Sequence, residues 1–102
     1  HWVSMFIDIR KKEIYYMDSY GVNIPHQIQK FVNKVIKQGE EMGEKYIFIQ
    51  NKKKHQYSST ECGIYSLYLI IQLIKGGDFQ KIISKRISDE KMKKLRNVYF
   101  NI

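Results

Sequence analysis

One cysteine stands in a setting that favours nucleophilic chemistry. Cys62 lies between a polar segment and an apolar run, which places it at the start of a helix, and Gly63 follows directly. The free N–H groups and partial positive charge of a helix N-terminus stabilise a thiolate, and a glycine lets a substrate backbone approach closely. A lone cysteine is more commonly a small buried hydrophobic residue, so catalysis is predicted only if partners for it exist elsewhere.

A thiol nucleophile needs a base, and the sequence offers three histidines. We expect His55 to be a solvated residue of a lysine-rich loop, and His26 to lie in the first turn of a helix after Pro25. His1 opens a β-strand, which would hold its imidazole rigidly, and the neighbouring indole of Trp2 could shield a thiolate–imidazolium pair from water. A histidine in that position, considered alone, is more often a surface or hydrogen-bonded structural residue.

Two further side chains complete a possible catalytic set. Asp18 ends the second strand of a predicted hairpin whose first strand begins near His1, so the carboxylate can lie across from the imidazole and fix its tautomer. Asp18 is followed by Ser19, and this pair is also an ordinary turn sequence. Gln56 precedes Cys62 by six positions, and its amide can donate to a developing oxyanion together with the backbone N–H of Cys62.

The elements that must position these residues can be predicted from apolar periodicity. Residues 2–8 and 13–17 are rich in β-forming residues and are joined by a short polar connection, which predicts a hairpin. After Pro25, apolar residues recur at three-to-four spacing, which predicts a helix that Gly39 and Gly43 break or end. Residues 45–50 form a third predicted strand, followed by a basic loop at 51–55.

Helices dominate the second half of the sequence. The apolar residues of 64–75 run nearly all round a helix, so we expect this to be the buried central helix, with Gly76 and Gly77 ending it. Two amphipathic helices are predicted over 78–86 and 88–98, the second with Ser88 as its N-cap. Strands, a helix, a strand and then helices indicate an α+β fold.

Composition restricts the function classes. The chain has 102 residues, a net charge of +8 and one cysteine. We expect one small domain or a piece of a larger one, without an internal disulfide and in an intracellular setting. The basic charge can attract nucleic acid, acidic proteins or anionic surfaces. No apolar stretch is long enough to span a membrane. Because a strand pattern begins directly at His1, without a Met, we expect a domain cut from a longer protein.

The pattern His1-Trp2, Asp18-Ser19, Gln56 and Cys62-Gly63 resembles the ubiquitin-like-protein protease family. That family includes SUMO-deconjugating enzymes, adenovirus-type proteases and polyprotein-processing proteases of large DNA viruses. The His-to-Asp separation of 17 and the Gln-to-Cys separation of 6 are similar to those of the family. The segment 86–96 resembles viral members more than cellular ones, and Glu61 stands where cellular members usually have Asp.

The resemblance implies the C-terminal catalytic part of a papain-like cysteine protease fold, with a small mixed sheet whose hairpin packs on a central helix. It implies Cys62 as nucleophile, His1 as base, Asp18 as its orienting residue and Gln56 as oxyanion donor. Trp2 and Gly63 would border the substrate, and no metal or cofactor is expected. Residues 1–102 would then form a single partial catalytic domain, whose missing N-terminal part supplies helices and much of the substrate channel.

Three functions follow as hypotheses. The first is thiol-dependent hydrolysis of peptide or isopeptide bonds after small or Gly residues, in ubiquitin-like proteins or a viral polyprotein. Its location would be the host cytoplasm or virion for a viral protein, and the nucleus or cytoplasm for a cellular one. The second is a non-catalytic binding module for a ubiquitin-like or viral partner. The third is nucleic-acid binding through the basic loop and the basic C-terminal segment, which can coexist with proteolysis. No membrane partner is expected.

Overall fold

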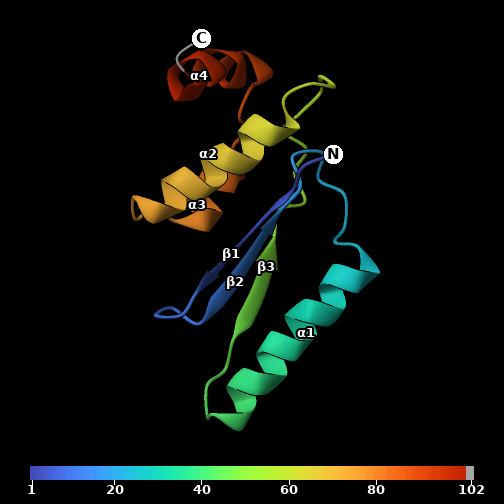
Figure 1. The fold of residues 1–102 in the computed structure, drawn as a ribbon, viewed down its shortest axis with the longest axis vertical. Coiled ribbons are helices and arrows are strands. Elements are labelled where there is room, and N and C mark those ends of the chain that lie inside the picture. The colour runs from blue at the N-terminus through green and yellow to red at the C-terminus, as the bar shows by residue number, and fades with distance from the viewer. Residues whose placement is uncertain (101–102) are drawn as a thin grey trace.

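A three-stranded mixed sheet forms the middle of the molecule (Figure 1). The structure is a computed structural model that describes residues 1–100. Strands β1 (Ser4–Asp8) and β2 (Glu13–Met17) form the predicted antiparallel hairpin, with Ser4 paired to Met17. Strand β3 (Ile47–Gln50) runs parallel to β2, so the strand order is β1-β2-β3 and β1 lies at one edge.

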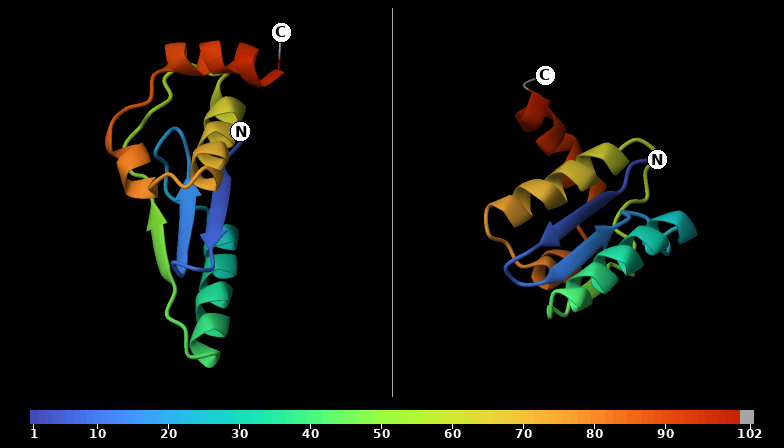
Figure 2. Two further views of the ribbon diagram at one scale, coloured as in Figure 1. Left: turned by 90° about the vertical axis from the view of Figure 1, so that its left-hand side faces the viewer. Right: turned by 60° about the horizontal axis from the view of Figure 1, so that its bottom comes forward.

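Helices cover both faces of this sheet (Figure 2). Helix α1 (His26–Glu41) covers one face, and α2 (Cys62–Ile74) and α3 (Phe79–Ser84) cover the other. Helix α4 (Asp89–Phe100) lies across the N-terminal end of α2 (Figure 1). The architecture is α+β, as predicted. No helix among residues 1–100 combines the length and the apolar character that a bilayer crossing requires.

The main core lies between the hairpin and the C-terminal helices. Alternate residues of β2, Tyr15 and Met17, point into it, while Ile14 and Tyr16 are buried on the opposite face of the sheet, as the two-residue period of a strand requires. The ring of Tyr15 stacks on Phe79 of α3, with centroids 4.7 Å apart. The other buried members come from α2, the segment after α3, and α4: Ile64, Tyr65, Leu69, Leu73, Ile87 and Met92.

Helix α2 is not buried all round, which corrects the expectation for the central helix. Ile64, Tyr65, Leu69 and Leu73 face the core, but Ile74 is 71% exposed. Leu67 and Ile70, on the same side as Ile74, border an open cavity instead of packed protein. The hydropathy of the sequence shows that both sides of α2 are apolar, but it does not show which side packs against the core.

Helix ends follow the sequence signals with one exception. Gly76 adopts a left-handed φ of 91° after α2, and the Asp78 carboxylate caps α3 by accepting from the Lys81 N–H at 3.0 Å. The predicted cap Ser88 accepts from the N–H of Lys91 at 3.2 Å. Gly39 does not break α1, because it lies inside the helix where the ring of Tyr46 packs, and a Cβ there would come within 2.6 Å of that ring.

Candidate active site

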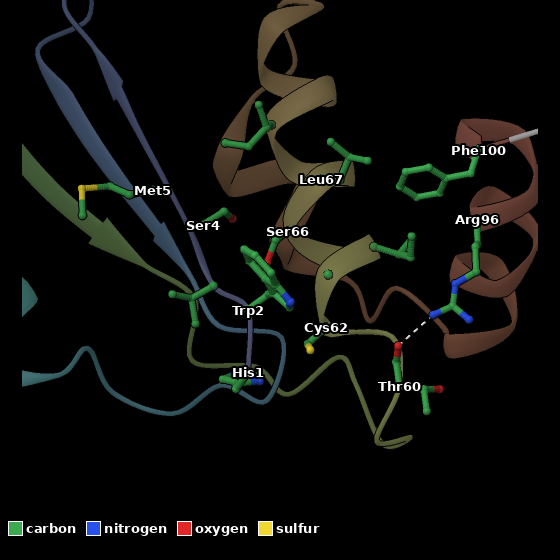
Figure 3. Close-up of a pocket in the computed structure, with 14 residues that line it drawn as sticks. His1, Trp2, Ser4, Met5, Thr60, Cys62, Ser66, Leu67, Arg96 and Phe100 are labelled. Atoms are coloured by element: carbon green, nitrogen blue, oxygen red, sulfur yellow. Dashed lines mark hydrogen bonds between the residues drawn. The ribbon is translucent and has the colours of Figure 1, made fainter.

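The two ends of the proposed catalytic pair meet at one cavity. His1 and Cys62, far apart in sequence, both line a cavity of about 850 Å³ between the start of β1 and the N-terminus of α2. Figure 3 shows the Cys62 side chain at the end of this cavity next to His1, with Trp2 beside them. The start of the chain and the N-terminus of α2 therefore meet, and a thiol and an imidazole line one solvent-accessible cavity.

The predicted contact between His1 and Asp18 is present. Nε2 of His1 lies 2.9 Å from Oδ1 of Asp18, a residue that is only 5% exposed. The same oxygen accepts the backbone N–H of Tyr20 at 2.8 Å, and the Tyr20 ring stacks on His1 with centroids 4.8 Å apart. Since Nε2 faces the carboxylate, Nδ1 is the ring nitrogen left for an exchange of protons with a thiol.

Neighbouring groups hold Asp18 in place and shape its acidity. The side chain of Asn51 bridges the Asp18 backbone, accepting its N–H at 2.9 Å and donating to its carbonyl at 2.7 Å. Burial raises the pKa of Asp18 above its ordinary value, and the hydrogen bond from the Tyr20 N–H opposes that rise. Asn51 is 1% exposed and was not among the residues that the sequence pattern singled out.

Cys62 is the first residue of α2, as predicted. The first helical hydrogen bond of α2 is donated by Tyr65 to the carbonyl of Glu61 at 3.0 Å, so the N–H groups from Cys62 to Ile64 have no acceptor inside the helix. The side chain of Glu61, at the N-cap, accepts none of them. These donors and the helix dipole favour negative charge at the thiol and beside it.

Trp2 and Gly63 form one wall of the cavity. Trp2 is 69% exposed, and a Cβ built on Gly63 would lie 3.6 Å from Cδ1 of its indole. The missing side chain of Gly63 thus leaves a narrow strip, wide enough for about one methyl group, between the indole and the helix N-terminus beside Cys62.

Gln56 is buried close to the site but does not line the cavity in this structure. Its Nε2 donates to the Ser58 carbonyl at 2.8 Å and to the Tyr20 hydroxyl at 3.2 Å, and its Oε1 accepts from the Ser19 hydroxyl at 2.5 Å. Both amide hydrogens are therefore in use. Gln56 is linked to the proposed catalytic residues through Tyr20, whose ring stacks on His1, and through Ser19, which follows Asp18 in the sequence.

His55 is fully buried, so the expectation of a solvated loop residue is wrong. Its Nδ1 accepts the backbone N–H of Ile87 at 2.9 Å, and its carbonyl accepts from the hydroxyl of Tyr65 and from Arg86. Burial lowers the pKa of His55, and the nearby charges of Lys53 and Arg86 act in the same direction. His26, in contrast, is an exposed first residue of α1, as predicted.

Charged residues beside Cys62 were not predicted to interact. Glu61, 1% exposed, pairs with Arg96 of α4 at 2.9 Å between Oε2 and Nη2. The same Nη2 donates to the carbonyl of Thr60 at 2.8 Å (Figure 3). Within residues 1–100, no group of three His, Cys, Asp or Glu side chains is arranged to hold a metal ion.

Comparisons with known proteins relate this chain to thiol proteases. The sequence profile described as "Ulp1 protease family, C-terminal catalytic domain" matches residues 1–101. A protein of Acanthamoeba polyphaga mimivirus, classed as a thiol protease, is 36% identical over 101 residues, which make up 98% of this chain and 33% of the relative. A SUMO-1 cysteine protease of African swine fever virus is 35% identical over 106 residues, covering 100% of this chain and 38% of the relative.

Solved structures give the same result. Two crystal structures of the African swine fever virus protease superpose on 94% of this chain with TM-scores of 0.85 and 0.84 and 33% sequence identity. The superposed part is 36% of one solved chain and 37% of the other. The chain thus spans between a third and two fifths of the length of the relatives that it matches.

Proposed function

This chain belongs to the Ulp1 protease family, and we propose that it supplies the catalytic centre of a thiol protease that cleaves peptide or isopeptide bonds in a protein substrate. The observation that carries the proposal is the cavity shared by Cys62 and His1, with His1 bonded to the buried Asp18. A binding module would not need a thiol at a helix N-terminus next to an imidazole held by a carboxylate.

The proposed reaction has two stages, acylation of Cys62 and hydrolysis of the resulting thioester, and His1 transfers protons in both. His1 accepts the Cys62 proton at Nδ1, and the thiolate attacks the scissile carbonyl carbon. The resulting imidazolium donates its proton to the leaving amine as the carbon–nitrogen bond breaks, which leaves a thioester on Cys62. Water, deprotonated by His1, then hydrolyses the thioester and restores the thiol. Asp18 holds the imidazole orientation and stabilises its cationic form.

The proposed oxyanion donors are the Cys62 N–H and the amide of Gln56. The first stands at the helix N-terminus without a helical acceptor. The second requires Gln56 to exchange its bond to the Ser58 carbonyl for the oxyanion. In this proposal the turn containing Ser58 shifts when substrate binds, which frees one amide hydrogen.

The proposed substrates carry small or Gly residues at the cleavage site. This preference comes from the resemblance to the family, and it is compatible with a glycine at position 63, which lines the cavity beside Cys62. A relative is named a SUMO-1 cysteine protease, which supports ubiquitin-like proteins as one candidate class, and processing of a viral polyprotein is the other.

The test is cleavage by the full-length protein of a panel of ubiquitin-like fusions and Gly-X peptides. We expect the wild type to cleave at least one of them and Cys62→Ser to lose cleavage. Ser84→Ala, at an exposed position of α3 outside the cavity, is the matched control and should retain it. Undiminished cleavage by Cys62→Ser would refute the assignment. Preferential labelling of Cys62 by a thiol probe separates an enzyme from a binding module.

A second candidate function, binding of nucleic acid, is supported by one surface feature. Tyr57 is 64% exposed, and two cations lie over its ring, with Lys54 Nζ at 4.7 Å and Arg86 Cζ at 4.5 Å from the ring centroid. An exposed aromatic ring can stack on a base once a cation moves from its face to a phosphate. This function can coexist with proteolysis.

A further inference from the structure

The segment that leads into Cys62 is held by the C-terminal helix. We call residues 57–61 the approach segment. At its end, Nη2 of Arg96 donates to the Thr60 carbonyl at 2.8 Å and pairs with Oε2 of Glu61 at 2.9 Å. The Thr60 hydroxyl donates to the other carboxylate oxygen of Glu61 at 3.0 Å. One guanidinium therefore holds the two residues immediately before Cys62.

This arrangement joins a guanidinium to a buried carboxylate. The Glu61 side chain is 1% exposed, and a buried carboxylate requires a charged partner to offset its lost hydration. Both contacts of Arg96 use one nitrogen, Nη2, which donates to the Thr60 carbonyl and forms an ion pair with Glu61. The planar guanidinium fixes the direction of both contacts, whereas a lysine ammonium is a compact point charge. The Arg96 side chain is 38% exposed and borders the same cavity as Cys62.

The other end of the approach segment is tied to the same helix. Asp89, in the first turn of α4, accepts the N–H groups of Tyr57 and Ser58 at 3.0 and 3.2 Å and the Ser58 hydroxyl at 3.3 Å. Asp89 and Arg96 are seven positions apart, so they lie on one face of the helix. Met92, between them on that face, is fully buried in the core and fixes the position of α4.

We propose that Arg96 is a positioning residue for Cys62, an inference that rests on the proposed protease function. By holding Thr60 and Glu61, Arg96 fixes the first turn of α2 and thereby sets the Cys62 thiol and N–H against His1 and the scissile carbonyl. It also neutralises the carboxylate of Glu61, whose charge would otherwise disfavour a thiolate on the adjacent residue. Asp89 anchors the far end of the same segment.

The test compares variants of the full-length protein by kinetics and by alkylation. Arg96→Met keeps most of the aliphatic stem and removes the charge. We expect it to lower kcat about 10- to 100-fold with little change in KM, because the thiol is displaced while the substrate surface remains. We also expect the curve of iodoacetamide alkylation rate at Cys62 against pH to move to higher pH. Lys94→Met, on an exposed position of α4, is the matched control and should change neither.

Two further variants separate positioning from folding. Arg96→Lys keeps a positive charge without the planar fork, so it should restore the alkylation profile more than it restores kcat. The double variant Glu61→Gln/Arg96→Met should recover part of the activity lost by Arg96→Met, because no unpaired buried carboxylate remains. If circular dichroism shows that Arg96→Met does not fold, the kcat values and alkylation profiles of Arg96→Lys and Glu61→Gln are compared with those of the wild type instead.

The outcomes distinguish this inference from the proposed function. An Arg96→Met protein with wild-type kcat and alkylation profile would overturn the positioning role, as would a loss confined to KM or one matched by Lys94→Met. If wild-type protein cleaves no substrate, the proposed function fails, and the alkylation profile still decides whether Arg96 sets the reactivity of Cys62.

Discussion

Asp18 offers the most direct test at the scale of single residues. Its Oδ1 contacts Nε2 of His1 and accepts the N–H of Tyr20, so Asp18→Asn can retain both contacts through the amide oxygen. It removes the charge that stabilises an imidazolium. We therefore expect kcat of the full-length protein to fall about 10²- to 10⁴-fold while its thermal midpoint changes little. Steady-state kinetics and thermal melts followed by circular dichroism measure the two quantities.

A matched carboxylate is available as the control. Asp8 ends β1 at the far end of the hairpin, and its side chain accepts the N–H of Lys11 at 3.0 Å. Asp8→Asn should leave kcat unchanged. Equal losses in the two variants, or none in Asp18→Asn, would contradict the role proposed for Asp18.

Gly63 should separate stability from activity. A Cβ at this position meets Trp2 at 3.6 Å, an ordinary contact, and Gly63 lies in a helix, so Gly63→Ala should stabilise the fold by up to about 1 kcal/mol. The same methyl group narrows the strip beside Cys62, so kcat/KM should fall about tenfold or more. Urea unfolding and kinetics give the two values.

Gly76 provides the converse control, a substitution expected to change stability without changing activity. With a φ of 91° after α2 and no atom within 4 Å of an added Cβ, Gly76→Ala should destabilise the fold by about 1 kcal/mol and leave kcat/KM unchanged. A Gly63→Ala enzyme of wild-type kcat/KM would show that substrate does not use the strip beside Trp2.

The residue contacts that could be predicted from sequence are those fixed by a regular element. The contact of His1 with Asp18 follows from hairpin pairing, which places the start of one strand beside the end of the next. Arg96 and Thr60 are separated by 36 residues with no repeat pattern between them, so their contact depends on how α4 packs. The hydrogen bonds of Gln56 depend likewise on an irregular turn at Ser58.

At the scale of elements, His55 joins the loop after β3 to the connection between α3 and α4. Its Nδ1 must be unprotonated to accept the Ile87 N–H. Because burial lowers the pKa of His55, the unfolded chain binds more protons than the folded chain as pH falls below about 6.5, and stability must fall with it. We expect the unfolding free energy to fall between pH 7.5 and 5.5 through His55, by at most about 1.4 kcal/mol, the limit for a histidine whose unfolded pKa is about 6.5.

Urea unfolding of two variants isolates this contribution. His55→Asn places an amide oxygen where Nδ1 accepts, so its stability should vary less between pH 7.5 and 5.5 than that of the wild type. His26→Asn changes an exposed histidine on α1 and should keep the wild-type pH dependence. An identical slope in the wild type and His55→Asn would show that His55 does not contribute the acid sensitivity.

The boundaries of most elements could be predicted, because apolar period and end signals are local. Strand β2 and the hairpin match the sequence pattern, and α2 to α4 begin within two residues of it. The prediction that Gly39 breaks α1 was wrong, because this glycine makes room for the ring of Tyr46, a residue beyond the helix. The prediction that α2 is buried on all sides was wrong for a related reason, because the apolar character of a helix face does not show which residues cover it.

At the scale of the whole molecule, the cations behind the net charge of +8 fall into two groups, those paired within the fold and those exposed to solvent. Arg96 is paired with Glu61, and Arg86 with Asp89 and the His55 carbonyl, so these two cations of the basic C-terminal segment serve the fold. The exposed cations at 52–54 stand in the loop beside Tyr57. If nucleic acid binds locally, this loop is where it should bind.

Two triple variants of equal charge decide between local binding and general attraction. Replacing the lysines at 52–54 by Ser should weaken binding to duplex DNA and reduce the slope of log affinity against log salt by about 2 to 3, because three phosphate contacts are lost. Replacing Lys30, Lys34 and Lys37, exposed on α1, by Ser removes the same charge and should change the slope little. Fluorescence anisotropy over a salt series measures both. Equal losses would show that net charge alone attracts DNA, and unchanged affinity in the loop variant would remove the second candidate function.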